Sequence, residues 1–256
     1  MTPISATWLE DRCEELKASI AFCTQLPFAR ATLQAAKALG KAGWAFPIAG
    51  LVVGLVGAVV YVLAHRLGLP PWPAAALSVT ATLIVTGALH EDGLADAADG
   101  FGGGGTRQQK LDIMRDSRTG AFGVCAVVLS LLLRVSTLAS FADAHGVVWA
   151  LLASHGAARS TMPALMWLVP PARGDGLSYE AGTPPGESVA AAAAIALIVL
   201  VFCLHPARGV IAFVVLTATV TLMAWLSARQ IDGQTGDVLG ALEQVSEVAV
   251  LLVALA

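Results

Sequence analysis

Three aspartates at helical spacing are the residues of this sequence best suited to chemistry. Asp92, Asp96 and Asp99 lie four and three positions apart, so on a helix their carboxylates share one face. Stacked carboxylates repel one another unless a cation lies between them, and carboxylate oxygens are ligands that Mg²⁺ and Mn²⁺ prefer. The pattern therefore predicts a divalent metal site; a solvated acidic face or a pair of Asp-Gly turns is the plain alternative.

A run of four glycines, residues 102–105, follows these aspartates. Because glycine has no Cβ, the backbone N–H groups of Gly103 and Gly104 could approach a phosphate closely. A flexible connection between two helices explains the run equally well. The run is thus a candidate phosphate-binding segment only in combination with the aspartates.

A block that mixes acids and bases comes next. Asp116 adds a fourth possible metal ligand, and Arg115 and Arg118 flank it as cations that can hold phosphate oxygens. Lys110 and Arg107 could bind phosphate, but they fit equally well as basic residues that only keep their loop on the cytoplasmic side of the membrane. Acid, base and glycine together predict a site for a metal-bound phosphate ester or diphosphate.

A second set of ionisable residues lies within or beside long apolar stretches. Such residues usually face the interior of a helix bundle and serve a function. The alternatives are a structural ion pair, for example Arg159 with Glu243 or Glu247, and an isolated Arg134 that snorkels to the interface. The set comprises Arg134, His155, Arg159, Asp237, Glu243 and Glu247.

The composition predicts an integral membrane protein. Hydrophobic residues make up 57% of the 256 and charged residues 13%, with a mean hydropathy of +0.75; soluble domains carry about twice that charged fraction. A disordered chain, a nucleic-acid-binding domain and a disulfide-rich module are excluded. The four cysteines form no metal or disulfide pattern and read as small buried hydrophobes. We expect one all-α membrane domain over residues 1–256.

Seven stretches are long and apolar enough to cross a membrane, which takes roughly 17–25 residues. They form the expected polytopic bundle within residues 43–256. The seven stretches are 43–63, 72–90, 120–139, 147–169, 188–204, 209–226 and 238–256.

The N-terminal residues 1–42 have a different pattern. Leu9, Cys13, Leu16, Ile20 and Cys23 recur at spacings of four and three with charges between them, which predicts an amphipathic helix on the membrane surface. The charges do not form the basic start and apolar core of a signal peptide. A second short, basic helix is expected at 30–41.

Most Lys and Arg residues fall on one side of this seven-span arrangement. The positive-inside rule places that side in the cytoplasm, and the membrane is then the cell inner membrane. The predicted catalytic loop, residues 91–118, lies on this side together with the segments 170–187 and 229–237.

Three blocks resemble one enzyme family, the adenosylcobinamide-GDP ribazoletransferases, also called cobalamin-5′-phosphate synthases. These blocks are residues 90–100 (HEDGLADAADG), 112–123 (DIMRDSRTGAFG) and 235–241 (TGDVLGA). Weaker similarity occurs at 24–27 and 46–50. The resemblance extends over nearly the whole chain in the same order.

The resemblance implies a multi-pass, Mg²⁺-dependent transferase of substituted phosphate groups. It would join adenosylcobinamide-GDP to α-ribazole or α-ribazole 5′-phosphate, release GMP and yield adenosylcobalamin or its 5′-phosphate, the last assembly step of cobalamin biosynthesis. The implied partners are these small molecules and the lipid bilayer, without nucleic acid; a homo-oligomer stays open.

The residues fit this chemistry, in which a ribose hydroxyl attacks a diphosphate and a nucleotide leaves. Arg115 and Arg118 would bind phosphate oxygens, and His90 would support a ligand. One of the carboxylates, or Glu91, would accept the proton of the hydroxyl. The expected metal ligands are Asp92, Asp96, Asp99 and Asp116, and Asp237 would complete the metal site or orient a substrate.

Two other functions are weaker alternatives. A CDP-alcohol phosphatidyltransferase would share the metal chemistry, and residues 96–100 begin its motif, but Gly103 and Gly104 stand where that motif has Ala and Arg. A membrane transporter would explain the ionisable residues within the spans. A transporter, however, concentrates its polar site near the midplane, whereas this chain concentrates its carboxylates at one interface.

Overall fold

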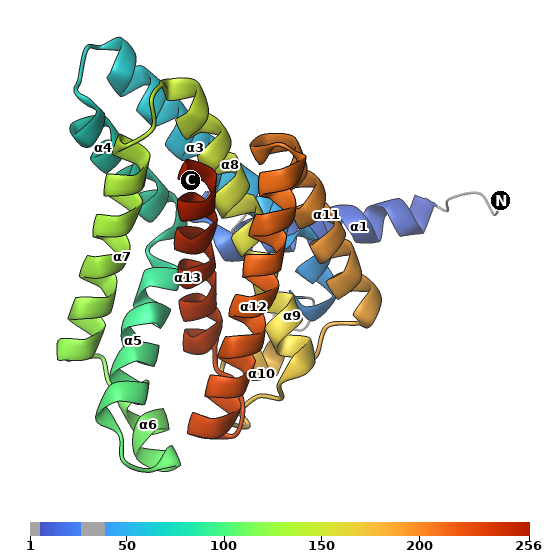
Figure 1. Cartoon of the computed structure of the whole chain (residues 1–256). Helices are drawn as coiled ribbons and strands as arrows, with labels where there is room; N and C mark the ends of the chain where they lie inside the picture. The colour runs from blue at the N-terminus through green and yellow to red at the C-terminus, as the bar shows by residue number, and fades with distance from the viewer. Residues whose placement is uncertain (1–5, 27–38) are drawn as a thin grey trace.

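The computed structural model describes residues 6–26 and 39–256, and the regular secondary structure of these residues is helical throughout (Figure 1). The expected short helix at 30–41 lies outside the described residues, except for its end. In chain order the helices are α1 (Ala6–Cys23), α2 (Leu39–Ala42), η3 (Gly43–Ala45), α3 (Phe46–Arg66), α4 (Pro71–Thr86), α5 (Leu89–Gly103), α6 (Arg107–Ile113), α7 (Ala121–Ala139), α8 (Ala144–Ala158), α9 (Thr161–Leu168), α10 (Leu177–Ala181), α11 (Gly186–Leu204), α12 (Pro206–Ile231) and α13 (Gly236–Leu255).

The structure confirms an all-α bundle with several membrane-spanning helices, although it does not confirm the number seven. Five stretches in the described residues are long and apolar enough to span: Leu39–Arg66, Ala121–Ala139, Gly186–Leu204, Pro206–Ile231 and Gly236–Leu255. Helices α4 and α5 qualify only when they are joined, and their axes differ by 89°.

The fourth expected span, 147–169, is broken into α8 and α9. Pro163 has no N–H, and its ring would clash with the carbonyl of residue 159 in a continuous helix. The hydroxyls of Ser160 and Thr161 donate to the carbonyls of Ala157 and Ala158, at 2.7 and 2.6 Å. These side-chain bonds compete with the helical pattern and stabilise the break.

A second break separates α4 from α5. Gly87 and Ala88 both have left-handed backbones, with φ of 65° and 54°, and the N–H of Gln25, just after α1, donates to the carbonyl of Val85 at 2.7 Å. Helix α5 carries Glu91, Asp92, Asp96 and Asp99. Because hydrocarbon excludes so many carboxylates, we treat α5 as lying outside the membrane-spanning segments.

Helix α1 buries a different face from the one its apolar spacing predicts. Leu9 and Cys13 are exposed, whereas Ala18 and Ser19, which are not part of the predicted apolar set, are buried; of that set Cys23 is buried as predicted. Glu15 is buried too, because its carboxylate accepts hydrogen bonds from Arg12 and from the indole N–H of Trp44. The second half of α1 therefore packs into the bundle beside η3 and α3.

The three segments expected on one side of the membrane do meet at one end of the bundle. The guanidinium of Arg107 donates to the carbonyl of Ile231 at 2.9 Å. Ala172 and Gln234 pair through their backbones, at 2.8 Å. Figure 1 shows α6, α10 and the last turns of α12 together at this end, and the α3–α4 and α7–α8 connections at the opposite end.

Helices α5 and α13 cross so closely that a Cβ at either glycine of the crossing would crowd the other helix. A Cβ on Gly93 would lie 3.0 Å from the carbonyl oxygen of Asp237, and a Cβ on Gly240 would lie 3.2 Å from the carbonyl oxygen of His90. Both neighbours are helix backbone, which cannot rotate away. This crossing brings Asp92 and Asp237 to the same place.

Gly93→Ala should therefore lower the unfolding temperature in detergent, with a loss of about 1–3 kcal/mol from overpacking. Gly186→Ala, at the start of α11, is the matched control, because its new Cβ would meet nothing nearer than 3.9 Å. Equal unfolding temperatures for the two variants would contradict the close crossing.

Candidate active site

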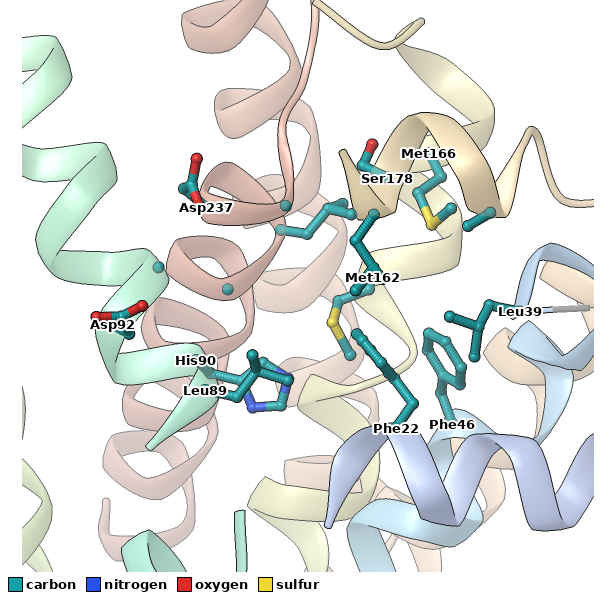
Figure 2. A pocket seen from close by; sticks show the side chains of 16 residues that line it. Phe22, Leu39, Phe46, Leu89, His90, Asp92, Met162, Met166, Ser178 and Asp237 are labelled. Carbon is teal, nitrogen blue, oxygen red and sulfur yellow. The ribbon is translucent and has the colours of Figure 1, made fainter. Parts of the chain in front are cut away.

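An acidic site lies where the exposed face of α5 meets the first turn of α13. Asp92 is exposed, Asp96 is half-buried one turn further along α5, and Asp237 comes from α13. Asp92 and Asp237 line the same cavity, and Figure 2 shows both carboxylates on one side of it. The structure thus brings together three of the five expected metal ligands.

Asp96 is surrounded by other carboxylates, so negative charge is concentrated at this site. Partial burial and the nearby carboxylates of Asp92, Asp237 and Asp99 raise the pKa of Asp96 to about 6, and only Arg173 acts against this rise. Like charges held this close favour protonation or a bound cation. The site is therefore chemically suited to a divalent metal ion.

Arg173 belongs to this site, although the sequence analysis did not select it. Its guanidinium donates to Oδ2 of Asp237 at 2.9 Å, and the hydroxyl of Thr235 donates to the same oxygen at 3.1 Å. The available signal was that Arg173 is the sole Lys or Arg between residues 170 and 187. Arg173 is thus the cation that pairs with a carboxylate of the acidic site.

Asp99 serves the fold in addition to its position near Asp96. Its two carboxylate oxygens accept from the backbone N–H groups of Gly120 and Gly123, at 2.6 and 2.9 Å. These are N–H groups at the start of α7, where a carboxylate is favoured by the helix dipole. Asp99 therefore fixes α7 against α5.

Asp116 is not brought to the acidic site. It pairs with Arg118, whose Nε donates to its Oδ1 at 3.0 Å, and these hydrogen bonds lower the pKa of Asp116 to about 2. Arg115 pairs with Asp175 instead, at 2.6 Å to Oδ2. Arg115 and Arg118 are both exposed at this end of the bundle.

The N–H groups of Gly104 and Gly105, in the run expected to form a phosphate cradle, are hydrogen-bonded within the protein. Gly103 is the last residue of α5, and the N–H of Gly104 donates to the carbonyl of Gly100 at 3.3 Å. The N–H of Gly105 donates to the side chain of Gln109, which caps α6. Lys110 is also engaged, since its ammonium donates to the carbonyl of Phe101 at 3.3 Å.

Glu91 faces away from the aspartates and into the bundle. It lies 2.7 Å from Nη1 of Arg134, whose Nε lies 2.8 Å from Glu247. Arg134 is 1% exposed, so the expectation that it snorkels to the interface is wrong. Glu91 thus joins α5 to α7 and α13, and its carboxylate is not available to a substrate at Asp92.

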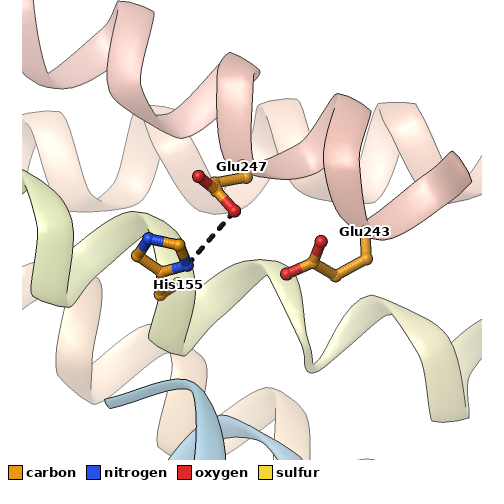
Figure 3. A group of neighbouring side chains, drawn as sticks. All are labelled: His155, Glu243 and Glu247. Atoms are coloured by element: carbon orange, nitrogen blue, oxygen red, sulfur yellow. Dashed lines mark ion pairs between the residues drawn. The ribbon is translucent and has the colours of Figure 1, made fainter. Parts of the chain in front are cut away.

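Figure 3 shows the continuation of this buried network on α8 and α13. Nδ1 of His155 lies 3.1 Å from Glu247, and Arg159 lies 2.8 Å from Glu243, which confirms the structural ion pair anticipated for Arg159. Within residues 6–26 and 39–256, His155, Glu243 and Glu247 are the sole trio with potential ligand atoms within 4.8 Å of one another. Arg134 pairs with Glu247 as well as with Glu91, and Arg159 pairs with Glu243, so the arrangement favours an ion-pair network over a metal centre.

Comparison with known proteins agrees with the resemblance of the motifs. Residues 15–255 match the family model described as Cobalamin-5-phosphate synthase. The chain is 52% identical to the adenosylcobinamide-GDP ribazoletransferase of Bradyrhizobium diazoefficiens, over 94% of this chain and 93% of that protein. It is 48% identical to the one of Mesorhizobium japonicum (94% and 92%) and 40% identical to the one of Ralstonia nicotianae (97% and 97%). No solved structure matches significantly.

Proposed function

The chain belongs to the cobalamin-5-phosphate synthase family, and from this premise we propose that it joins adenosylcobinamide-GDP to α-ribazole 5′-phosphate or α-ribazole and releases GMP. The observation that carries the proposal is that Asp92 and Asp237 line one cavity, that Asp96 lies near both of them, and that Arg173 donates a hydrogen bond to Asp237. Phosphoryl transfer depends chiefly on positioning and on neutralising charge, and this site supplies groups for both.

We propose Mg²⁺ as the cofactor, held by Asp92, Asp96 and Asp237. The charges of Asp92 and Asp237 act on Asp96, although the oxygens of the three side chains do not all lie within 4.8 Å of one another. A hard divalent ion drawn between them would relieve the repulsion that raises the pKa of Asp96. When bound, the ion would neutralise the charge that develops on the diphosphate. Asp99 supports this set from α5, where it is already bonded to α7.

Side chains at and near the acidic site have defined roles in the proposed transfer. The ribose hydroxyl of the acceptor forms a bond to the phosphorus next to cobinamide, the bond from that phosphorus to GMP breaks, and GMP leaves with the electron pair. Asp92 accepts the hydroxyl proton, since its carboxylate lines the cavity and has no hydrogen bond or ion pair among the described residues. Arg173 holds the diphosphate, and the exposed Arg115 and Arg118 attract it to this end of the bundle.

Release of GMP tests the proposal directly. Purified membranes with adenosylcobinamide-GDP, α-ribazole phosphate and Mg²⁺ should release GMP and form the cobalamin product. Absence of GMP would contradict the transferase proposal. Release of CMP from a CDP-alcohol would favour a phosphatidyltransferase, and substrate flux into vesicles without any chemistry would favour a transporter.

We also place the acidic site on the cytoplasmic side of the inner membrane. The segments that carry most of the Lys and Arg residues meet at this end of the bundle, and such segments remain in the cytoplasm. A cysteine introduced at Asp112, which is exposed on α6, should react with an impermeant maleimide in inverted vesicles and not in right-side-out vesicles. The opposite labelling would reverse the orientation.

The pKa of Asp96 predicts a pH dependence of metal binding. Because this pKa is about 6, the side chain is a carboxylic acid below pH 6 and a metal-binding carboxylate above it. Affinity for Mg²⁺ or Mn²⁺ should therefore rise about tenfold from pH 5 to pH 7.5, measured by calorimetry on the detergent-solubilised protein. Asp96→Asn should bind more weakly and lose this pH dependence; a wild-type affinity that is equal at both values would contradict the role of Asp96.

A further inference from the structure

A largely apolar cavity lies against the acidic site. Its empty volume is about 770 Å³, open mouth included. Phe22 and Phe46 stack with ring centroids 5.7 Å apart and form one wall, and Met162, Met166 and Leu239 line the rest. Figure 2 shows Phe22, Phe46, Met162 and Met166 on the side of the cavity opposite Asp92 and Asp237.

His90 is a buried polar side chain of this cavity that has no hydrogen-bond partner among the described residues. It is 2% exposed, and neither ring nitrogen is hydrogen-bonded. The nearest carboxylate, of Glu243, lies 3.6 Å from Nδ1, which is too long for a hydrogen bond. Ser178, by contrast, donates to Gln234 at 2.6 Å. A buried imidazole carries at least one N–H, and here that donor has no acceptor within hydrogen-bond distance among the described residues.

We propose that this cavity binds the base of the acceptor nucleoside, an inference that rests on the function proposed above. The base of α-ribazole is a benzimidazole with two methyl groups. It is flat and apolar, and one ring nitrogen keeps a free lone pair after the other is bonded to ribose. Aromatic and Met side chains suit such a ring, and the N–H of His90 matches the single acceptor.

The position of the cavity also fits the reaction. A base held among Phe46, Met162 and Leu239 would place its ribose toward Asp92 and Asp237, which line the same cavity. The attacking hydroxyl then lies at the group proposed to accept its proton. The cavity therefore orients the acceptor and, at the same time, selects its base.

The guanine of the donor fits this cavity poorly. Guanine carries several donors and acceptors along one edge, and burying them among Phe, Met and Leu side chains would leave them unpaired. The corrin ring is far larger than a nucleoside base and remains outside. Among the components of the two substrates, the benzimidazole is thus the one whose chemistry matches the lining.

A series of acceptors tests this assignment. The α-riboside 5′-phosphates of dimethylbenzimidazole, benzimidazole and adenine are compared as acceptors with saturating adenosylcobinamide-GDP. For the wild type we expect a KM about tenfold lower for the dimethyl acceptor than for the unmethylated one, because two methyl groups are buried. Adenine, which has a polar edge, should be the poorest acceptor.

Two variants report on the cavity itself. Met162→Ala should reduce the tenfold methyl preference to about threefold or less, since it removes part of the wall. His90→Phe should raise the KM of both benzimidazole acceptors about tenfold, and His90→Gln, which restores a donor, should recover part of this loss. Ala164→Leu is the control: it lies on the same helix as Met162 but lines a separate surface between α11 and α12, so the methyl preference should not change.

The possible results distinguish a failure of the base-site proposal from a failure of the proposed function. No GMP release from any acceptor would refute the proposed function. Normal release with a methyl preference that is unchanged in Met162→Ala would overturn the base site alone. If Met162→Ala raises only the KM of adenosylcobinamide-GDP, the cavity would be assigned to guanine, and this result would also overturn the base site. If Met162→Ala does not fold, Leu239→Phe narrows the cavity instead and should reverse the methyl preference; an unchanged preference in this variant would likewise overturn the proposal.

Discussion

Asp92→Asn should reduce GMP release about 10³-fold while the protein remains folded. Asp92 is exposed and has no hydrogen bond or ion pair among the described residues, so its loss removes little from the fold. It is proposed both as a ligand of Mg²⁺ and as the acceptor of the hydroxyl proton, and removal of a single group that stabilises the transition state already costs about 10²–10³-fold. Initial rates of GMP release at saturating Mg²⁺ measure this effect.

Asp112→Asn is the matched control for the same change of charge. Asp112 is also exposed and close to the same end of the bundle, and its carboxylate accepts one hydrogen bond, from Gln108 at 2.8 Å. We expect less than about a threefold change, as is usual for a screened surface charge. Equal losses in the two variants would show that the effect is general electrostatics and not the chemistry of Asp92.

Arg134→Met should destabilise the folded protein by about 3–5 kcal/mol, because it leaves buried carboxylates unpaired. Arg134 lies within 2.8 Å of both Glu91 and Glu247 and also donates to Thr82 at 3.1 Å. A loss of this size is a large share of the total stability of most domains. The unfolding temperature and the yield of monodisperse protein in detergent measure it.

Two further variants separate lost pairing from lost side-chain volume. Arg229→Met removes an exposed arginine that stacks over Trp225 at the end of α12, and we expect a change of no more than about 1 kcal/mol. Adding Glu91→Gln and Glu247→Gln to Arg134→Met removes the orphaned charges and should recover at least half of the lost stability. Wild-type unfolding of Arg134→Met would contradict the buried network.

The two predictions differ because different residues of α5 contribute to the acidic site and to the packing of the bundle. Asp92 and Asp96 turn toward the acidic site, whereas His90 and Glu91 are buried. Neighbouring residues of a helix point in different directions, so one short helix can carry residues of the acidic site on one face and residues that pack into the bundle on another. The same acidic block therefore contains residues whose loss should affect catalysis and residues whose loss should affect folding.

Several features followed from the sequence alone. Composition identified a helical membrane protein, the spacing of Asp92 and Asp96 placed both on one exposed face, and the charge distribution grouped the segments that meet at one end. The family followed from motifs distributed along the whole chain. These features depend on local periodicity and on residue type, which are properties that a sequence expresses directly.

Other features required the tertiary structure. The spacing of the aspartates did not reveal that Asp99 would cap α7, that Asp116 would pair with Arg118, or that Arg173 would reach Asp237. Those partners lie in other segments, and their meeting depends on how whole helices pack, as at the crossing of Gly93 and Gly240. Helical periodicity determines which face of a helix a residue occupies. Which residues that face contacts is determined only by the packing of the helices, in which buried charges are stable only beside opposite charges.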